Sequence, residues 1–397
     1  MDRKKVLLLC ASHNDLGTVL ALKKMGFYII VTGNVDTAPG IKYADKYIKA
    51  DYSDKELILG IAREYGIDAI CQCCNDYGVY TAAYVAEQLG LPGYDSYDTT
   101  LLLHNKDRFK KFAMDLGLIT PQTYSFSSKE EAAEWLKMRR EYPIILKPSD
   151  ASAGNGISRA DDLEEAMSAL ELAFAKTRNG HIVIEDFIEG TQHGFCTFLR
   201  DRKVVAVCSN NEYSIQNKYR VEIDTFPSST YEESAPLLIE EIEKIAEVLQ
   251  LKDGIFHLQY IFKDGKPYIL EVMRRILGNM YHVPGNKLTN MDWEYWDARV
   301  RVGMSLDAFP QKVMQEGFFS YKTVLAPHDG VVAEISVSDE LKNHEYSTYM
   351  LEGPGHLVTR WKSEPLGFIF TAWPTMDEML TSLIDRYGGV EVTMEEQ

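Results

Sequence analysis

One lysine followed by a loop of small residues is the stretch of this sequence best suited to phosphate chemistry. Residues 143–146 are apolar and include a β-branched pair, which predicts a strand that ends at Lys147. Ser152, Gly154 and Gly156 follow, and their small size would let backbone N–H groups approach an anion closely. The Lys147 ammonium would add a point charge on the phosphate oxygens. A flexible hairpin tip is the alternative, because a short glycine-rich loop is a weak motif by itself.

Three further features occur in order around this loop. Lys106 lies upstream of it, residues 183–190 form an acidic stretch that predicts a strand, and residues 267–278 contain Glu-x-x-x-Arg-x-x-Gly. In this order the set resembles the ATP-grasp superfamily, in its branch of biotin-carboxylase-like and carbamoyl-phosphate-synthase-like carboxylate–amine ligases. The resemblance covers about residues 1–310 and, more loosely, the remainder.

The resemblance implies which residues would bind ATP. Lysines of the family contact the nucleotide phosphates, and a hinge strand holds adenine and ribose between backbone groups and an apolar side chain. The family often has a glutamate on the ribose, whereas this chain has an uncharged glutamine at that position, followed by a histidine. The implied cofactor-binding residues are Lys106, Lys147, Ser152, Gly154, Gly156, Glu185, Phe187, Ile188, Gln192 and His193.

A hairpin late in the sequence should bring two oxygen donors together. Its Asp-Gly turn is a strong hairpin signal, and counting outward from the turn indicates that Gln259 and Glu271 can oppose each other on one face. A carboxylate beside a polyphosphate is best explained by Mg²⁺, with Mn²⁺ as an alternative ion. Strand alternation predicts that Ile269 and Met273 share the Glu271 face, yet Met273 replaces the family's usual asparagine and a thioether is too soft to bind magnesium. Catalytic roles are implied for Lys147 and for Arg275, whose guanidinium would hold the transferred phosphoryl group.

Composition excludes several classes of protein. The 397 residues predict two or three domains, and the net charge of −17 argues against nonspecific nucleic-acid binding. No apolar run approaches the ~20 residues that cross a bilayer, so we expect a cytoplasmic protein without a membrane partner. The sequence is compatible with a homodimer. The Cys-Gln-Cys-Cys motif at 71–74 has no matching ligand cluster and is typical of a buried strand end.

The fold class is expected to be α/β, with α+β character in the later domains. Strand–helix alternation over 1–98 predicts a doubly wound domain, which resembles the one preceding ATP-grasp in the family. The resemblance implies an ATP-grasp domain over 99–310, with a lid at about 121–188. A small β-rich carboxy-terminal domain would occupy 311–397.

Several polar residues have two interpretations. Asn75, Asp76 and His13 could line a substrate crevice beside the first domain, or could cap helices. Lys218 and Arg220 alternate, so both could face one side of a strand toward phosphate or substrate. Residues 278–286 are rich in Gly, Pro and Asn and predict a substrate-contacting loop.

Together these features predict an ATP-dependent ligase that joins a carboxylate to an amine or thiol through an acyl phosphate and releases ADP and phosphate. A carboxylase or phosphorylating ATP-grasp enzyme is one alternative. A nucleotide-binding module without ligase activity is another, and Met273 favours it. The sequence names neither the acid nor the amine.

Overall fold

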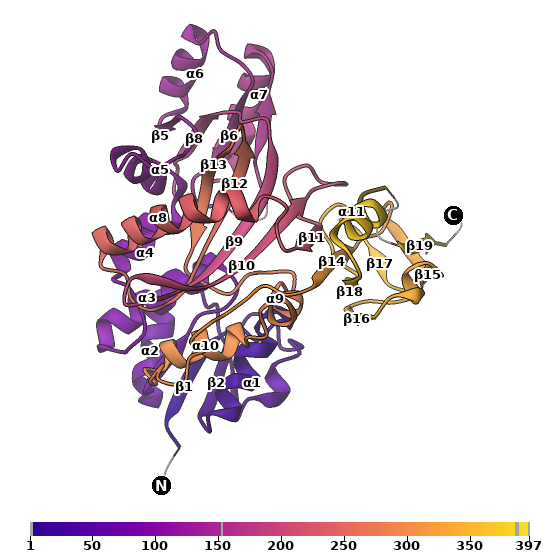
Figure 1. Ribbon diagram of the computed structural model, residues 1–397. Coiled ribbons are helices and arrows are strands. Elements are labelled where there is room, and N and C mark those ends of the chain that lie inside the picture. Colours follow the sequence, from indigo (N-terminus) through magenta and orange to yellow (C-terminus); the bar gives the residue numbers. More distant parts are fainter. Residues whose placement is uncertain (1–2, 152–153, 386–388, 396–397) are drawn as a thin grey trace.

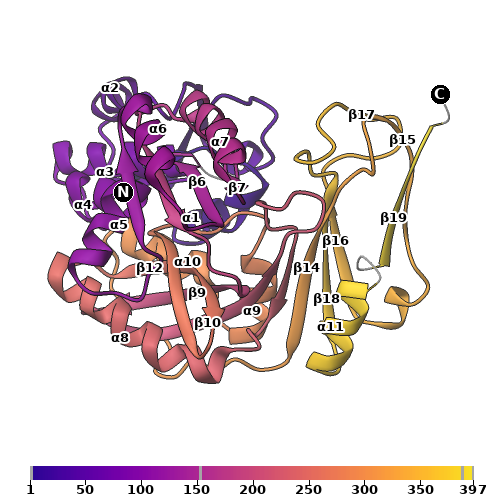
Figure 2. The ribbon, with the colours of Figure 1, turned by 90° about the horizontal axis from the view of Figure 1, so that it is seen from above.

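The computed structural model describes residues 3–151, 154–385 and 389–395. An antiparallel eight-stranded sheet runs through its centre, and three smaller sheets surround it (Figures 1 and 2). In Figure 1 the amino-terminal sheet lies at the bottom, a sheet with two covering helices at the top, and the carboxy-terminal strands at the right. Among the described residues no helix combines the length and hydrophobicity required to span a bilayer.

The amino-terminal sheet is parallel, in the order β3-β2-β1-β4. Strand β1 is continuously apolar and buried from Val6 to Leu9, as in doubly wound folds whose sheets are covered on both faces, whereas the edge strand β3 has an exposed lysine at each end. Side chains of β1 alternate between two cores, with Val6 and Leu8 in one and Leu7 and Leu9 in the other. The elements are β1 (Lys5–Leu9), β2 (Tyr28–Gly33), β3 (Lys46–Lys49), β4 (Ala69–Cys71), α1 (Leu16–Lys24), α2 (Lys55–Tyr65), α3 (Asp76–Leu89) and the short 3-10 turns His13–Asp15 and Ile41–Tyr43.

A second four-stranded sheet, in the order β5-β8-β6-β7, carries Lys147 at the end of β6. Helices α6 and α7 pack on one face through an apolar cluster that includes Leu136, Leu146 and Leu170. Asp162 caps α7 because its carboxylate accepts the backbone N–H of the third helical residue. The elements are β5 (Thr123–Phe126), α6 (Lys129–Met138), β6 (Ile144–Pro148), β7 (Ser158–Ala160), α7 (Leu163–Lys176) and β8 (Ile182–Asp186).

The central sheet has the order β13-β12-β9-β10-β11-β14-β18-β16. Helices α4, α5 and α8 cover one face, while α9 and α10 cover part of the other. The rest of that second face is open toward the amino-terminal sheet and the β5-β8-β6-β7 sheet. The elements are α4 (Tyr97–His104), α5 (Lys106–Asp115), β9 (Thr191–Arg200), β10 (Lys203–Tyr213), β11 (Ile223–Phe226), α8 (Tyr231–Leu249), β12 (Gly254–Lys263), β13 (Lys266–Met273), α9 (His282–Thr289), α10 (Trp293–Arg301), β14 (Phe318–Val324), β16 (Tyr346–Met350) and β18 (Gly367–Trp373).

The carboxy-terminal segment contributes to two sheets. Strands β14, β18 and β16 extend the central sheet, and β17-β15-β19 form a separate small sheet. Helix α11 packs beside β14 and β18 (Figure 2). The remaining elements are β15 (Gly330–Val337), the 3-10 turn Leu341–Asn343, β17 (Leu357–Val358), α11 (Met376–Asp385) and β19 (Val390–Met394).

The predicted hairpin is present, with one irregularity. Gln259 lies opposite Glu271, as expected, but the next pair is Tyr260 with Ile269, so Leu270 is an extra residue in β13. Such a bulge turns the flanking side chains to new faces. The prediction that Ile269 shares the Glu271 face is therefore wrong, because Ile269 packs in the core beneath α8.

Two local predictions are also wrong. Lys218 and Arg220 lie in the loop between β10 and β11 rather than on a strand. The expected loop at 278–286 becomes helix α9 from His282 onward, although it contains proline and glycine. Pro284 lies in the first turn of this helix, where a missing N–H costs no helical hydrogen bond.

Candidate active site

Two cavities that share lining residues lie where the β5–β8 sheet, the amino-terminal sheet and the open face of the central sheet meet. The smaller has a volume of about 360 Å³ and is lined from all three. The larger, of about 1020 Å³, lies beside β6, β8 and the loop that follows β8. Both are lined by Ile145, Lys147, Gln192, Lys218, Tyr219 and Leu270.

Lys106 and Glu271 meet in the smaller cavity from distant parts of the chain. Lys106 is the first residue of α5, and its Nζ lies 2.9 Å from Oε2 of Glu271 on β13. The same ammonium donates a hydrogen bond of 2.9 Å to the carbonyl of Ala151 in the small-residue loop. Burial alone would raise the pKa of Glu271, but the nearby Lys106 charge outweighs burial and the pKa falls. Glu271 is therefore an ionised oxygen donor beside the loop.

Lys147 belongs to a buried network with Glu185 and Lys110, and the sequence analysis singled out the first two residues but not Lys110. Its Nζ lies 2.7 Å from Oε2 of Glu185, and Nζ of Lys110 lies 3.4 Å from Oε1 of the same carboxylate. Lys110 also donates to Thr120 Oγ1 and to the carbonyl of Ile269, each at 2.9 Å. Burial lowers the pKa of Lys110 to about 8, although the Glu185 charge opposes the shift. Lys110 could have been suspected, since it follows Lys106 by one helical turn.

The amide of Gln259 is oriented by a carboxylate that the sequence analysis did not single out. Nε2 of Gln259 and Nε2 of Gln192 each donate to Oε2 of Glu212, at 2.7 Å. This leaves Oε1 of Gln259 available to a cation beside Glu271. Two oxygen donors suit Mg²⁺, which commonly takes one or two protein ligands and completes its shell with phosphates and water. Met273 also lines this cavity but supplies no oxygen.

Arg275 reaches the smaller cavity and is fixed by the amino-terminal part of the chain. Its Nε lies 2.7 Å from Oδ1 of Asp76, and Nδ1 of His104 lies 3.2 Å from the same oxygen. Burial opposes the charged guanidinium, but Asp76 outweighs it and raises the pKa of Arg275 further. Asn75 caps α3 through its side-chain oxygen. Of the two interpretations, capping holds for Asn75 and cavity lining holds for both Asn75 and Asp76.

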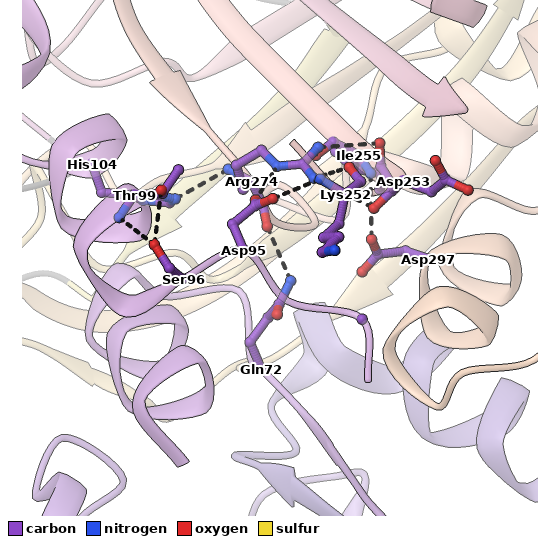
Figure 3. Close-up of polar contacts among 12 residues, drawn as sticks. Gln72, Asp95, Ser96, Thr99, His104, Lys252, Asp253, Ile255, Arg274 and Asp297 are labelled. Atoms are coloured by element: carbon purple, nitrogen blue, oxygen red, sulfur yellow. Dashed lines mark hydrogen bonds and ion pairs between the residues drawn. The ribbon is translucent and has the colours of Figure 1, made fainter. Parts of the chain in front are cut away.

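The neighbouring Arg274 is surrounded by Asp95 and by the backbone of residues 252–255 (Figure 3). Its guanidinium pairs with Asp95 at 3.0 Å and donates to carbonyls of residues 252–255. Its backbone N–H donates to Nε2 of His104 at 3.1 Å, which fixes the ring that contacts Asp76. The two arginines follow the end of β13 and have different partners, Asp95 for Arg274 and Asp76 for Arg275.

Five of the remaining residues predicted to bind the cofactor line at least one of the two cavities. Glu185, Phe187, Ile188 and Gln192 line the larger cavity, and Gly154 lines the smaller. A Cβ on Gly154 would lie 2.2 Å from the carbonyl of Tyr219, so only glycine permits the approach of these two loops.

Two of the predicted residues, Gly156 and His193, line neither cavity. Ser152 lies outside the described residues. Gly156 packs against Pro148 and Lys176, behind the loop. His193 is 1% exposed on the opposite face of β9, where its ring stacks on Tyr260 with centroids 5.1 Å apart.

No group of three or more His, Cys, Asp or Glu side chains suited to a metal ion occurs in the described part of the chain. Cys71 and Cys73 are buried, as expected for a strand end, and burial raises the pKa of both thiols. A cation in the smaller cavity would therefore depend on ligands from a bound nucleotide.

Comparison with known proteins identifies the family. Residues 105–309, about half of the chain, match the family described as "Carbamoyl-phosphate synthase L chain, ATP binding domain". The chain belongs to this family and, with it, to the ATP-grasp superfamily, and its mixed α/β architecture is the ATP-grasp fold.

Individual relatives are more distant. The carbamoyl phosphate synthase large chain of Clostridium beijerinckii is 25% identical over 270 residues, covering 65% of this chain and 24% of that protein. The glutathione biosynthesis bifunctional protein GshAB of Streptococcus thermophilus is 24% identical over 274 residues, covering 67% of this chain and 35% of that protein. The L-amino acid ligase from Bacillus licheniformis has a similar structure, with a TM-score of 0.82, 18% identity and full coverage of both chains. This chain thus spans about a quarter to a third of the length of these two curated relatives, and the structural likeness establishes the shared fold.

Proposed function

We propose that this protein is an ATP-dependent ligase that joins a small carboxylic acid to an amine through an acyl phosphate. The observation that carries the proposal is the convergence of Lys106, Lys147 and Glu271, from three distant segments, on the smaller cavity. Such convergence of two cations and one carboxylate suits a metal-bound triphosphate. The matched family and the names of its relatives support the same class of reaction.

In the proposed reaction the γ-phosphoryl group of ATP passes to the substrate carboxylate, and the amine then displaces phosphate from the acyl carbon. Lys106 and Lys147 would hold the phosphates, and the guanidinium of Arg275 would steady the oxygens of the transferred group. Catalysis would therefore consist mainly of positioning and charge stabilisation. Gln259 and Glu271 would hold Mg²⁺, which when bound neutralises charge on the phosphate oxygens.

The larger cavity is the proposed nucleoside site. Phe187 and Ile188 offer it an apolar wall, and Gln192 offers an amide to ribose hydroxyls. Glu185 is already held by two lysines, so we propose that it mainly positions Lys147 rather than binding adenine. A small-molecule enzyme of this kind would work in the cytoplasm.

A phosphate-release screen tests the proposal. Paired acids and amines are supplied with ATP and Mg²⁺, and at least one pair is expected to release ADP and phosphate in equal amounts. Lys147→Ala is expected to abolish this turnover, while Lys129→Ala, an exposed change on α6, leaves it intact. Full turnover by a folded Lys147→Ala protein would contradict the role of Lys147. Turnover that requires bicarbonate instead would indicate a carboxylase-like enzyme.

Met273 favours a second candidate, a nucleotide-binding protein without ligase activity. It occupies a cavity position where an oxygen would strengthen the metal site. Calorimetry distinguishes the two candidates. ATP binding without ADP release across panels of amino acids and sugar acids would support the second.

A further inference from the structure

A row of polar residues crosses the open face of the central sheet, beside the proposed metal ligands. Glu212 on β10 lies directly opposite Asp224 on β11, which in turn lies opposite Tyr321 on β14. All three side chains line the smaller cavity. Like charges directly opposite each other destabilise a sheet, so this arrangement requires a compensating group.

The two carboxylates are buried and lack a cationic partner. Glu212 is 8% exposed and Asp224 is 2% exposed, and among the described residues neither forms an ion pair with lysine, arginine or histidine. Oδ1 of Asp224 has no hydrogen-bond partner in the described structure, although the side chain faces the cavity.

The other acidic groups that line this cavity are already satisfied. Glu271 pairs with Lys106, and Asp76 pairs with Arg275. Asp150 accepts backbone N–H groups of residues 178 and 179. Lys218 and Arg220 line the facing loop without reaching ion-pair distance of the Glu212 or Asp224 carboxylate in the described structure. Among the described acidic groups that line this cavity, Glu212 and Asp224 are therefore the two whose charge no lysine, arginine or run of backbone N–H groups offsets.

We propose that Glu212 and Asp224 form the subsite that receives the amine substrate as its ammonium ion. The inference rests on the proposed ligase function and specifies its amine as a primary amine that is positively charged near neutral pH. Three N–H donors of an ammonium match the free Oδ1 of Asp224 and the remaining acceptor sites of the two carboxylates. Tyr321 lies directly opposite Asp224 on the neighbouring strand, and the amides of Gln192 and Gln259 donate to Glu212 and orient it.

Calorimetric titration with glycinamide tests the subsite without ATP turnover. Glycinamide carries an ammonium group, whereas N-acetylglycinamide has a similar size and no charge. The wild-type protein is expected to bind glycinamide and not N-acetylglycinamide. Asp224→Asn is expected to weaken glycinamide binding at least about tenfold, because one charge-assisted hydrogen bond is lost. Glu240→Gln changes an exposed carboxylate on α8 and serves as the matched control.

A second readout separates binding from a structural role. Asp224→Asn removes one of two facing carboxylates, so its unliganded thermal midpoint should be equal to or higher than that of the wild type. A large destabilisation, equal glycinamide affinity in both proteins, or no saturable binding to the wild type would each overturn the proposal. Because this titration needs no catalysis, failure of the phosphate-release screen would reject the ligase function independently of the result obtained here.

Discussion

We expect His193 to make the stability of the folded protein depend on pH, and the substitution His193→Gln tests this. The ring is buried on the face of β9 that points away from both cavities. Its Nε2 lies 2.7 Å from Thr191 Oγ1, and its Nδ1 lies 3.0 Å from Ser228 Oγ. Burial lowers the pKa of His193 to about 4, although a hydrogen bond with Asn211 opposes the shift. The folded protein therefore keeps this ring neutral in mildly acidic solution.

The magnitude follows from linkage between protonation and folding. An unfolded histidine takes up its proton near pH 6.5, whereas folded His193 does so only near pH 4. The unfolded state binds more protons between these values, so the contribution is complete above about pH 6.5 and is lost as the pH falls toward 4. At about pH 5 the loss amounts to about 2 kcal/mol, which corresponds to roughly 4–8 °C in the unfolding midpoint of a domain of this size.

Differential scanning calorimetry at about pH 8 and about pH 5 measures the effect. On acidification the unfolding midpoint of the wild type is expected to fall by roughly 4–8 °C more than that of His193→Gln. His328→Gln, an exposed change, should behave as wild type. Equal acid shifts in wild type and His193→Gln would refute the argument from burial. MgADP affinity is expected to be unchanged in His193→Gln, and a marked loss would show that this residue serves the nucleotide after all.

Two further substitutions test the site. Lys110→Met is expected to destabilise the protein by about 3–5 kcal/mol, because it leaves Glu185 partly unpaired in the interior, whereas Lys111→Met on the exposed face of the same helix should change the thermal midpoint little. Met273→Asn adds an oxygen donor beside Glu271 and is expected to tighten ADP binding when Mg²⁺ is present but not when it is absent. Calorimetric titration of ADP under both conditions checks the second prediction, and an equal gain without the metal would contradict it.

Much of the local structure could be predicted from the sequence. The apolar run that forms β1 and the alternation of strands and helices after it predict the parallel sheet, because such strands must be covered on both faces. The Asp-Gly turn predicts the hairpin and sets the register of the two strands beside it as far as the pair Tyr260 and Ile269. Beyond that pair the bulge at Leu270 brings Glu271 opposite Gln259. These signals are short in range, so each can be recognised from a few neighbouring residues.

Other features of the site have no local signal. The bulge at Leu270 reverses the face of Ile269, and no residue nearby in the sequence announces it. His193 follows Gln192 directly, yet strand alternation sends one side chain to the cavity and the other to the core. Arg274 and Arg275 are neighbours just beyond the end of β13, and their different partners depend on distant residues, Asp95 and Asp76.

What the sequence by itself determined is the set of elements and the order of the residues that would bind a nucleotide. Only the tertiary structure decided which charges meet. Lys110 is paired with Glu185 through packing of α5 on β8, and Glu212 is set against Asp224 through strand pairing. Hydrophobic periodicity specifies which face of an element is buried, but the partners of a buried charge depend on how distant elements are placed against one another.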